Sequence, residues 1–564
     1  MISCIPTDRY AGPPGRPMPL FFLLLLTAWA AVIVDADGDT ISGASAASLP
    51  YETRWYDQTL DHFQLPLSDD SRPSPSAPPR RWRQRYLIND DYFGRPANAS
   101  ENYEYGLPWP PPGRETWLTA SCPGPILLYT GNEGDIAAFW GANGFMHRLA
   151  ATWGGLILFP EERYYGQSIP SEEVRYLSTE QVLEDYVELL GSVKRGYGAK
   201  PCPAVAFGGS YGGSLATFLR ATRPLSVVGA LAASAPVGYY DATNWEGHGV
   251  DGFTWAELAA RAYRDAAPGG GACLEAIWAA ARLVDDAVPE LVMDAFQFCD
   301  DRALKPDQSS TFLYALESLP QQNYPYEIGP MPAWPVSAVC SIMTNAHDSG
   351  RGSANDLVLA AAAATSLAMG FSDDSGRCIP TPNEGPGNVP GDGPGKGSWG
   401  YQSCTETLHM FSSHGSEGGG LRQYSFDLQG SIEICKKTWG ADAIPDVKKL
   451  SSEYGGYKLG DGLTNITNII WSLGELDPWS GGCFRSSHWI PGEKERQDRS
   501  VHFLSMPNGA HHLDLRGDHP ADPTDIRATR KIEEKILWGW IEDWRYEWEA
   551  AASVEMGVSI SAMR

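Results

Sequence analysis

A serine at the centre of a glycine-rich turn is the feature that most constrains the fold of this chain. The apolar run Val205-Ala206-Phe207 leads into Gly208-Gly209-Ser210-Tyr211-Gly212, and apolar residues then follow at helical spacing. Gly-x-Ser-x-Gly between a strand and a helix is typical of a strained turn that lifts the serine hydroxyl clear of a sheet. Side chains in place of the flanking glycines would clash with the neighbouring strand or helix. The alternative is a chance match, because the chain contains 60 glycines.

Further apolar runs predict a sheet around this turn. They cover residues 126–129, 156–159, 227–232, 468–473 and 501–504, and helical patterns cover 179–191 and 525–549. Continuous apolar runs that alternate with helices are typical of a parallel sheet buried on both faces. After residue 240 the pattern changes to helix-like segments that carry six of the cysteines. We therefore expect an α/β fold with a helical insertion after the serine.

These patterns divide the chain into six segments. We expect a signal peptide over residues 1–36, an irregular N-terminal extension over 37–124, the first part of the α/β domain over 125–240, the helical insertion over 241–459, the second part of the α/β domain over 460–550, and a tail over 551–564. Within the extension, residues 83–88 have the pattern of a short edge strand, and the proline-rich stretches on either side of them read as loops.

The N-terminus has the pattern of a secretory signal. Arg9 and Arg16 precede an apolar run that starts at Leu20 and ends before Asp35, and Ala30 is one of several small residues that offer a cleavage site. A signal anchor is the alternative, but the run is shorter than a membrane span. Two glycosylation sequons, at Asn98 and Asn465, fit a lumenal protein.

Charge and cysteine content agree with that compartment. The formal net charge of −26 argues against nucleic acid and against an anionic membrane surface as partners. Cys4 would leave with the signal, and the other nine cysteines match no zinc-binding pattern, so no metal is expected. An odd number of cysteines in a secreted chain predicts disulfides with one thiol left over.

A serine nucleophile needs a histidine base and a carboxylate that orients the base. In the order typical of hydrolases with this turn, the acid follows a late strand and the histidine follows the last strand. Asp477 comes after the run ending at Leu473, and His511 comes after the run ending at Leu504. Glu475 is the alternative acid and His512 the alternative base. We favour Asp477 for its place in the turn before a proline, and His511 for its place after Gly-Ala at the loop tip.

At this point the chain resembles a known family, the lysosomal Pro-X carboxypeptidase and dipeptidyl-peptidase II group of serine exopeptidases. The matching stretches lie at residues 60–63, 84–86, 129–135, 163–166, 208–213, 404–406, 476–482 and 509–516. The resemblance implies an α/β-hydrolase domain whose large helical, disulfide-stapled cap is inserted between the nucleophile and the catalytic acid. It also implies cleavage next to proline by a triad of Ser210, Asp477 and His511.

The resemblance further implies three cap disulfides, Cys273–Cys340, Cys299–Cys378 and Cys404–Cys435. Of the remaining cysteines, Cys122 and Cys202 each precede a strand expected to be close to the other, so we expect them to pair and Cys483 to be free. The chain departs from the family pattern at three positions. Glu162 stands where histidine is usual, Leu473 where asparagine is usual, and Ser214 where methionine is frequent.

Residues outside the triad are candidates for oxyanion and substrate binding. The backbone N–H of Tyr211 and the loop at Asn132 are expected to form the oxyanion hole. Glu133 and Asp135 on the same loop are candidates for a substrate ammonium, with a structural role as the alternative. The aromatic face of Trp479 suits a proline ring. Ser214 is expected to widen that pocket and to admit alanine.

The expected function is therefore a serine exopeptidase that hydrolyses short peptides next to proline, best at acidic pH. A Pro-X carboxypeptidase is favoured slightly over a dipeptidyl-peptidase, because both branches share the motifs. An esterase or lipase on the same fold and an inactive peptide-binding relative are the other hypotheses. We expect short proline-containing peptides as partners, no cofactor, and no membrane association after signal removal. If the chain assembles, we expect a homodimer. Lysosome, vacuole and extracellular space are the expected locations.

Overall fold

A computed structural model gives the fold of the chain. It describes residues 49–63, 80–95, 122–240, 245, 250–266, 271–299, 308–348, 354–371, 378–379, 398–456, 463, 465–489 and 492–555. The predicted signal peptide and the sequon at Asn98 lie outside the described residues.

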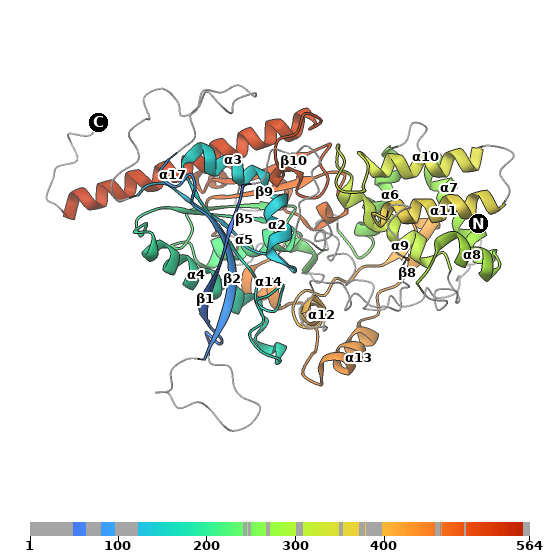
Figure 1. The fold of residues 1–564 in the computed structure, drawn as a ribbon, viewed down its shortest axis with the longest axis horizontal. Coiled ribbons are helices and arrows are strands. Elements are labelled where there is room, and N and C mark those ends of the chain that lie inside the picture. The colour runs from blue at the N-terminus through green and yellow to red at the C-terminus, as the bar shows by residue number, and fades with distance from the viewer. Residues whose placement is uncertain are drawn as a thin grey trace, which may run out of the picture.

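An eight-stranded sheet forms the centre of the larger domain (Figure 1). Its strands are β1 (Glu52–Thr59), β2 (Arg81–Asn89), β3 (Ile126–Tyr129), β4 (Leu156–Pro160), β5 (Ala204–Gly209), β6 (Gly229–Ala233), β9 (Ile469–Gly474) and β10 (Val501–Met506), in the order β1-β2-β4-β3-β5-β6-β9-β10. The six strands from β4 to β10 pair in parallel, and β2 is antiparallel to both of its neighbours. The predicted buried parallel sheet is confirmed.

Helices cover both faces of this sheet, as its continuous apolar strands require. On one face, α2 (Ile136–Ala142), α3 (Gly144–Trp153) and α17 (Thr524–Glu555) pack on strand residues that include Leu127 and Phe207. On the other face, α4 (Thr179–Gly196) and α5 (Tyr211–Thr222) pack on alternate residues, including Leu128 and Ala206. The strand order, with the turn after β5, is that of an α/β-hydrolase domain. Helix α17 runs through Glu555, so the predicted tail begins inside it.

The N-terminal extension is not irregular, and this prediction was wrong for its described part. It supplies β1, the outermost strand, and β2, which spans nine residues and lies between β1 and β4 rather than at the edge. The first six of the eight residues of β1 are exposed or only partly buried, so its sequence lacks the apolar run of a buried strand. Strand β2 begins with alternating arginines, so its apolar run is short, although its last six residues are buried.

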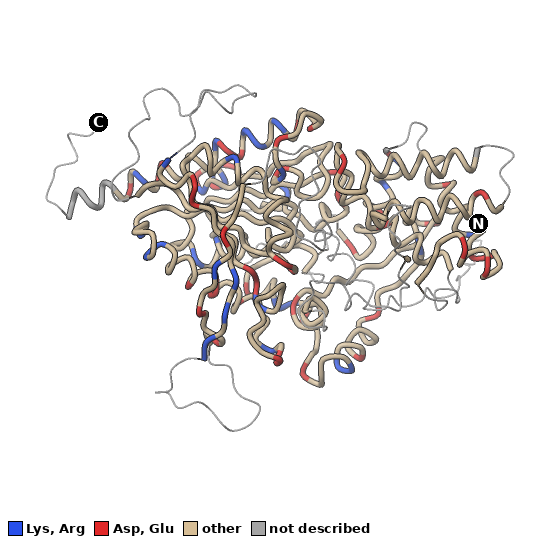
Figure 2. The backbone as a smooth tube through the Cα atoms, in the orientation of Figure 1, with Lys and Arg blue, Asp and Glu red and all other residues tan. Residues whose placement is uncertain are grey.

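The insertion builds a separate lobe next to the sheet domain (Figure 1). Its helices are α6 (Thr254–Ala266), α7 (Ala272–Asp286), α8 (Pro289–Phe296), α9 (Ser310–Ser318), α10 (Pro335–Asp348) and α11 (Ala354–Ala368), and they share one apolar core. Helices α10 and α11 carry few charges along their length (Figure 2). The short strands β7 (Ser413–His414) and β8 (Gln423–Tyr424) and the helices α12 (Ser398–Ser403), α13 (Leu428–Trp439) and α14 (Lys449–Tyr454) complete the insertion.

The last part of the insertion packs on the hydrolase core rather than in the lobe. Trp399 of α12 and Tyr454 of α14 belong to the same buried cluster as α4 and α5. Tyr454 stacks on Phe218 of α5, with ring centroids 4.4 Å apart. The insertion is therefore one lobe plus a return segment that lines the sheet domain.

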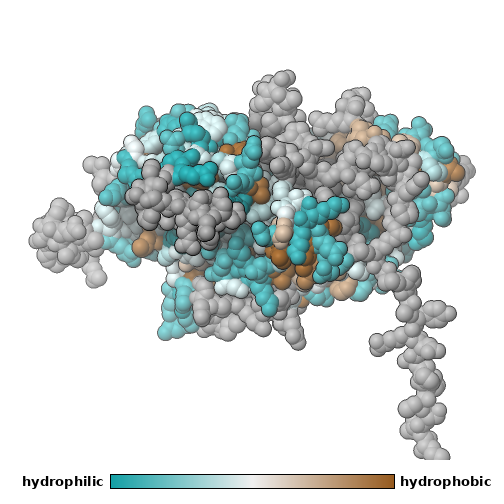
Figure 3. Space-filling model, turned by 90° about the horizontal axis from the view of Figure 1, so that it is seen from below, coloured by the Kyte–Doolittle hydropathy of each residue, from teal (hydrophilic) through white to brown (hydrophobic). Residues whose placement is uncertain are grey.

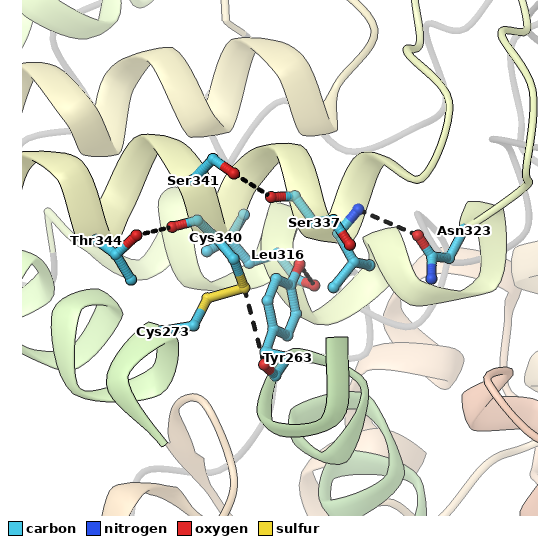
Figure 4. Close-up of a disulfide and its surroundings, with 9 residues drawn as sticks. Tyr263, Cys273, Leu316, Asn323, Ser337, Cys340, Ser341 and Thr344 are labelled. Atoms are coloured by element: carbon cyan, nitrogen blue, oxygen red, sulfur yellow. Dashed lines mark hydrogen bonds between the residues drawn. A yellow bond between two sulfur atoms is a disulfide. The ribbon is translucent and has the colours of Figure 1, made fainter. Parts of the chain in front are cut away.

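All four predicted disulfides are present. Cys273–Cys340 joins α7 to α10 and lies beside Tyr263, whose hydroxyl donates to the Leu316 carbonyl at 2.6 Å (Figure 4). Cys299–Cys378 and Cys404–Cys435 staple other parts of the insertion. Cys122–Cys202 links the residues before β3 and β5, which are hydrogen-bonded neighbours in the sheet. Among the described cysteines, Cys483 is free and buried.

We expect peptide mapping under non-reducing conditions to recover these four pairs and Cys483 as a thiol. Burial and the nearby Asp477 raise the pKa of the Cys483 thiol well above its usual value. Alkylation of the native protein should therefore be slow at Cys483, and should become complete only after unfolding. A bridged Cys483 in the unreduced digest would contradict the assignment.

Candidate active site

Ser210 lies at the turn between β5 and α5, in a backbone conformation that a serine rarely adopts. Its φ is 59° and its ψ is −127°. A Cβ on Gly208 would lie 2.1 Å from the Gly212 carbonyl oxygen, and one on Gly212 would lie 2.3 Å from the Gly131 carbonyl oxygen. Both glycines are therefore required, because any side chain would clash with a backbone oxygen that cannot move away. The strained turn is the arrangement in which a serine hydroxyl is presented at the sheet edge.

Asp477 and His511 meet at the same edge of the sheet. Asp477 follows β9 and His511 follows β10, and these parallel strands end side by side. The Nδ1 atom of His511 lies 2.6 Å from the Oδ2 atom of Asp477, with both side chains buried. The backbone N–H of Trp479 donates to the other Asp477 oxygen at 3.0 Å. These contacts fix the orientation of the carboxylate and of the imidazole ring that it faces.

The structure separates the favoured residues from their alternatives. Glu475 forms a two-bond ion pair with Arg485, at 2.6 and 3.0 Å. Burial alone would raise the pKa of Glu475, but its bonds to Arg485 and Ser505 lower it. His512 packs against Gly209, and burial, with His511 next, lowers its pKa well below the usual value. Among the described residues, no hydrogen bond joins Glu475 to His511 or His512 to Asp477.

The loop after β3 packs against the serine turn. The Thr130 hydroxyl donates to the Gly212 carbonyl at 2.7 Å, and the Asn132 side chain donates to the Gly209 carbonyl at 3.0 Å. The Asn132 amide also donates to Glu133 at 3.2 Å. The Asn132 side chain is thus occupied in joining the loop to the turn. This leaves the loop backbone, beside the N-terminus of α5, as the part that would face an oxyanion.

Asp135 makes the contacts of the structural role that was the alternative to substrate binding. Its carboxylate accepts from the backbone N–H of Ala137 as the N-cap of α2, and it pairs with Arg85 of β2. Arg85 also pairs with the buried Glu161. The cation partner of Asp135, Arg85, lies in the predicted strand 83–88, but nothing in the sequence places that strand beside the loop after β3.

Trp479 lies in a cluster of buried rings next to His511. We call this group the aromatic cluster: Tyr239, Trp255, His409, Phe411 and Trp479. The ring centroids of Trp479 and His511 are 6.3 Å apart. Ser214 of α5 is fully buried close to the Tyr240 hydroxyl. The surface seen in Figure 3 is mostly hydrophilic where it is described, with a hydrophobic patch near its middle.

Several residues from the insertion support this site and have no sequence signal. In the short helix η6 (Leu319–Gln322), the Gln321 carbonyl accepts from the His511 backbone N–H at 3.0 Å, and its side chain accepts from Trp479 at 3.1 Å. The Tyr324 hydroxyl donates to the His511 carbonyl at 3.1 Å. His409 in the aromatic cluster stays neutral at ordinary pH, because burial lowers its pKa to about 3. These positions are distant in sequence from the motifs, so only the fold identifies them.

Other predicted features can be placed briefly. Asn465 is exposed, and the Thr467 hydroxyl of its sequon accepts from Arg220 at 2.6 Å. Within the described ranges, no group of three or more His, Cys, Asp or Glu side chains could hold a metal ion. A search of the same residues finds no helix long and apolar enough to cross a bilayer.

Comparison with known proteins adds to this geometry. Residues 114–533 match the family described as serine carboxypeptidase S28. A lysosomal Pro-X carboxypeptidase from Bos taurus is 30% identical over 88% of this chain and 89% of the relative. Prolyl carboxy peptidase like protein 5 from Caenorhabditis elegans is 30% identical over 75% of this chain and 85% of the relative. A proline iminopeptidase structure from Mycobacterium smegmatis matches over 82% of this chain and 96% of its own, at 11% identity and a TM-score of 0.31.

The family match covers most of the chain, including the turn at Ser210 and the loops of Asp477 and His511. The sheet order, the strained serine and the buried Asp–His pair are the parts that a serine peptidase needs. The chain therefore belongs to the serine carboxypeptidase S28 family of serine peptidases.

Proposed function

We propose that this protein is a serine exopeptidase that hydrolyses short peptides next to proline, with Ser210, His511 and Asp477 as its catalytic triad. The observation that carries the proposal is the buried pair of His511 and Asp477, 2.6 Å apart, at the sheet edge where the strained Ser210 lies. His512 packs against Gly209, so the histidine loop contacts the residue before the serine. An inactive relative would have no need to keep these arrangements together.

The proposed mechanism follows from these positions. The Ser210 hydroxyl attacks the scissile carbonyl carbon while Nε2 of His511 accepts the hydroxyl proton. Asp477 accepts a hydrogen bond from the Nδ1–H of His511, which orients the ring and stabilises the imidazolium that forms. The backbone N–H of Tyr211 and the backbone at Asn132 stabilise the developing oxyanion. His511 then donates its proton to the leaving amine, and water hydrolyses the acyl-enzyme in a second cycle of the same proton transfers.

The aromatic cluster supports a preference for proline on the acyl side of the bond. Trp479 lies between His511 and the other rings of the cluster, so an apolar ring bound there would be next to the catalytic base. Aromatic faces bind the flat, apolar proline ring with little loss of conformational freedom. Ser214, beside Tyr240, is shorter than the methionine frequent at this position, which supports tolerance for alanine.

For the cleaved end we favour a Pro-X carboxypeptidase, supported by the name of the Bos taurus relative and by its length match. One observation favours the dipeptidyl-peptidase alternative. Glu133 and Glu162 are both buried close to the serine turn, and carboxyl groups are what a substrate ammonium would require. The predicted signal, the disulfides and the lysosomal relatives support a secretory-pathway location, in a lysosome, a vacuole or outside the cell.

Two matched peptides distinguish the cleaved ends. We expect N-acetyl-Ala-Pro-Phe to release free phenylalanine, because a carboxypeptidase does not need a free N-terminus. Free Ala-Pro-Ala-Phe should give no Ala-Pro dipeptide at early times. Mass spectrometry of the products, with Ser210→Ala as the blank, makes the measurement. Release of Ala-Pro together with refusal of the acetylated peptide would contradict the carboxypeptidase proposal and support the dipeptidyl-peptidase.

A further inference from the structure

Glu162 is a buried carboxyl group in contact with the residue that follows the candidate nucleophile. It comes directly after Glu161, in the loop that follows β4, and its side chain has no exposed surface. One carboxyl oxygen accepts from the Tyr211 hydroxyl at 3.0 Å and from the Gln402 amide at 3.4 Å. The other carboxyl oxygen is buried and has no hydrogen-bond partner among the described residues. The mechanism above gives this group no role.

No cation compensates a charge on Glu162. Within the described part of the chain no ion pair reaches it, and the cations beside it in sequence and beside its neighbour Glu406 are paired elsewhere. Arg163 is bound to Asp185 by two hydrogen bonds, at 2.6 and 2.7 Å. Lys449 of α14 is paired with Glu406 at 2.5 Å. An isolated carboxylate in such a site is strongly disfavoured, so the group takes up a proton.

Two acidic groups that face Glu162, Glu133 after β3 and Glu406 after α12, also favour its neutral form. The other titratable groups near it are the tyrosines Tyr186 of α4, Tyr211 of α5 and Tyr240 of the short helix after β6. Burial, followed by the Glu133 carboxyl, holds the pKa of Glu162 well above its usual value, against the lowering effect of the Tyr211 hydroxyl. Tyr165 binds Gln402, which in turn donates to the Tyr211 hydroxyl at 2.8 Å. Glu162 is therefore the acidic member of a buried polar cluster beside the oxyanion donors.

We propose that Glu162 is a positioning residue that works as a neutral carboxylic acid, and that its ionisation sets the upper pH limit of activity. The proposal rests on the proposed function, because it assigns the oxyanion hole to Tyr211 and Asn132. Tyr211 contacts Glu162, and Asn132 is bonded to Glu133. Glu133 thus belongs to the loop that carries Asn132, and Glu162, from the loop after β4, binds the first residue of α5. Charge on both would push those segments apart.

The packing between these segments leaves little freedom for such a shift. A Cβ on Gly212 would lie 2.3 Å from Gly131 O and 2.8 Å from Asn132 Oδ1, so the loop and the first turn of α5 are in close contact. Oxyanion donors work only when they are held at hydrogen-bond distance from the reacting oxygen. A small separation of the two segments would therefore lower the rate constant for acylation before it unfolds the protein.

The test compares the pH dependence of kcat/KM for the wild type, Glu162→Gln and Glu533→Gln on a prolyl peptide. Glutamine has the shape of the neutral acid and cannot ionise. We expect Glu162→Gln to retain acidic-pH activity within about threefold, and its alkaline limb to move up by about one pH unit or more. Glu533 of α17 is an equally buried acid with a raised pKa, away from Tyr211. The Glu533→Gln variant should keep the wild-type alkaline limb.

An unchanged alkaline limb in Glu162→Gln, or loss of its acidic-pH activity with the fold intact, would overturn the proposal. If Glu162→Gln does not fold, Tyr211→Phe replaces it in the test. Loss of the hydrogen bond from the Tyr211 hydroxyl should raise the pKa of Glu162 and move the alkaline limb to higher pH. An unmoved alkaline limb in this variant would overturn the proposal. The same profiles are measured as rates of fluorophosphonate labelling of Ser210. If the labelling rates show the expected alkaline limb but prolyl peptides are not hydrolysed, the proposed substrate is contradicted and the role of Glu162 is still supported.

Discussion

Replacing Ser210 with alanine is expected to abolish peptide hydrolysis while the protein remains folded. The loss should be on the order of 10⁵-fold or more in kcat, because the residual rate of a triad enzyme without its nucleophile comes only from binding and the oxyanion hole. Alanine tolerates the φ of 59° about as poorly as serine does, so the turn keeps its strain and the melting temperature should change little. Steady-state kinetics and thermal unfolding of the same preparation make the measurement.

The control for this experiment is a serine near the site that the mechanism does not use. Ser480 is fully buried in the short helix after Asp477. Its replacement by alanine should leave kcat within about threefold of the wild type. Hydrolysis by Ser210→Ala at more than a few per cent of the wild-type rate would show that another group is the nucleophile.

The second large effect is expected for Asp477→Asn. Asparagine keeps the shape of the side chain, but it presents an N–H or a neutral oxygen to His511 and no longer fixes the imidazole tautomer. The expected loss in kcat is on the order of 10⁴-fold, as in other triads. The bond from the Trp479 backbone can still form, so the loop should keep its conformation.

Glu475→Gln is the matched control, because it lies two residues away and faces Arg485 instead of His511. It should keep kcat within about threefold, with a small loss of stability from the partly exposed ion pair. Equal losses for the two variants would contradict the assignment of Asp477. In the same series, normal activity of His511→Ala beside an inactive His512→Ala would show that the other histidine is the base.

The sheet and the triad could be predicted because their signals are local in the sequence. Buried strands such as β5 and β9 are continuous apolar runs, and the loops that follow them carry the functional side chains. Gly208 and Gly212 admit no other residue type, because a Cβ at either position would lie less than 2.5 Å from a backbone oxygen. Such constraints act within one or two turns of chain, so one sequence is enough to show them.

The rest could not be predicted because it depends on contacts between distant segments. Strand β1 is largely exposed and charged, so it carries no apolar run, although it completes the sheet. Gln321 and Gln402 lie in the insertion, where nothing in the sequence relates them to His511 or Tyr211. Asp135 could be mistaken for a ligand because nothing in the sequence places the strand of its partner, Arg85, beside the loop after β3.

The central claim is that Ser210 is the activated nucleophile, and its most direct test is the site of covalent labelling. A fluorophosphonate reacts only with a serine whose proton is removed by a neighbouring base. The native protein, incubated with the reagent and digested, should carry one phosphonyl group, on the peptide that contains Ser210. Prior incubation with a prolyl peptide should slow the labelling, and Asp477→Asn should nearly abolish it. A labelled residue other than Ser210, or equal labelling of the unfolded protein, would contradict the account.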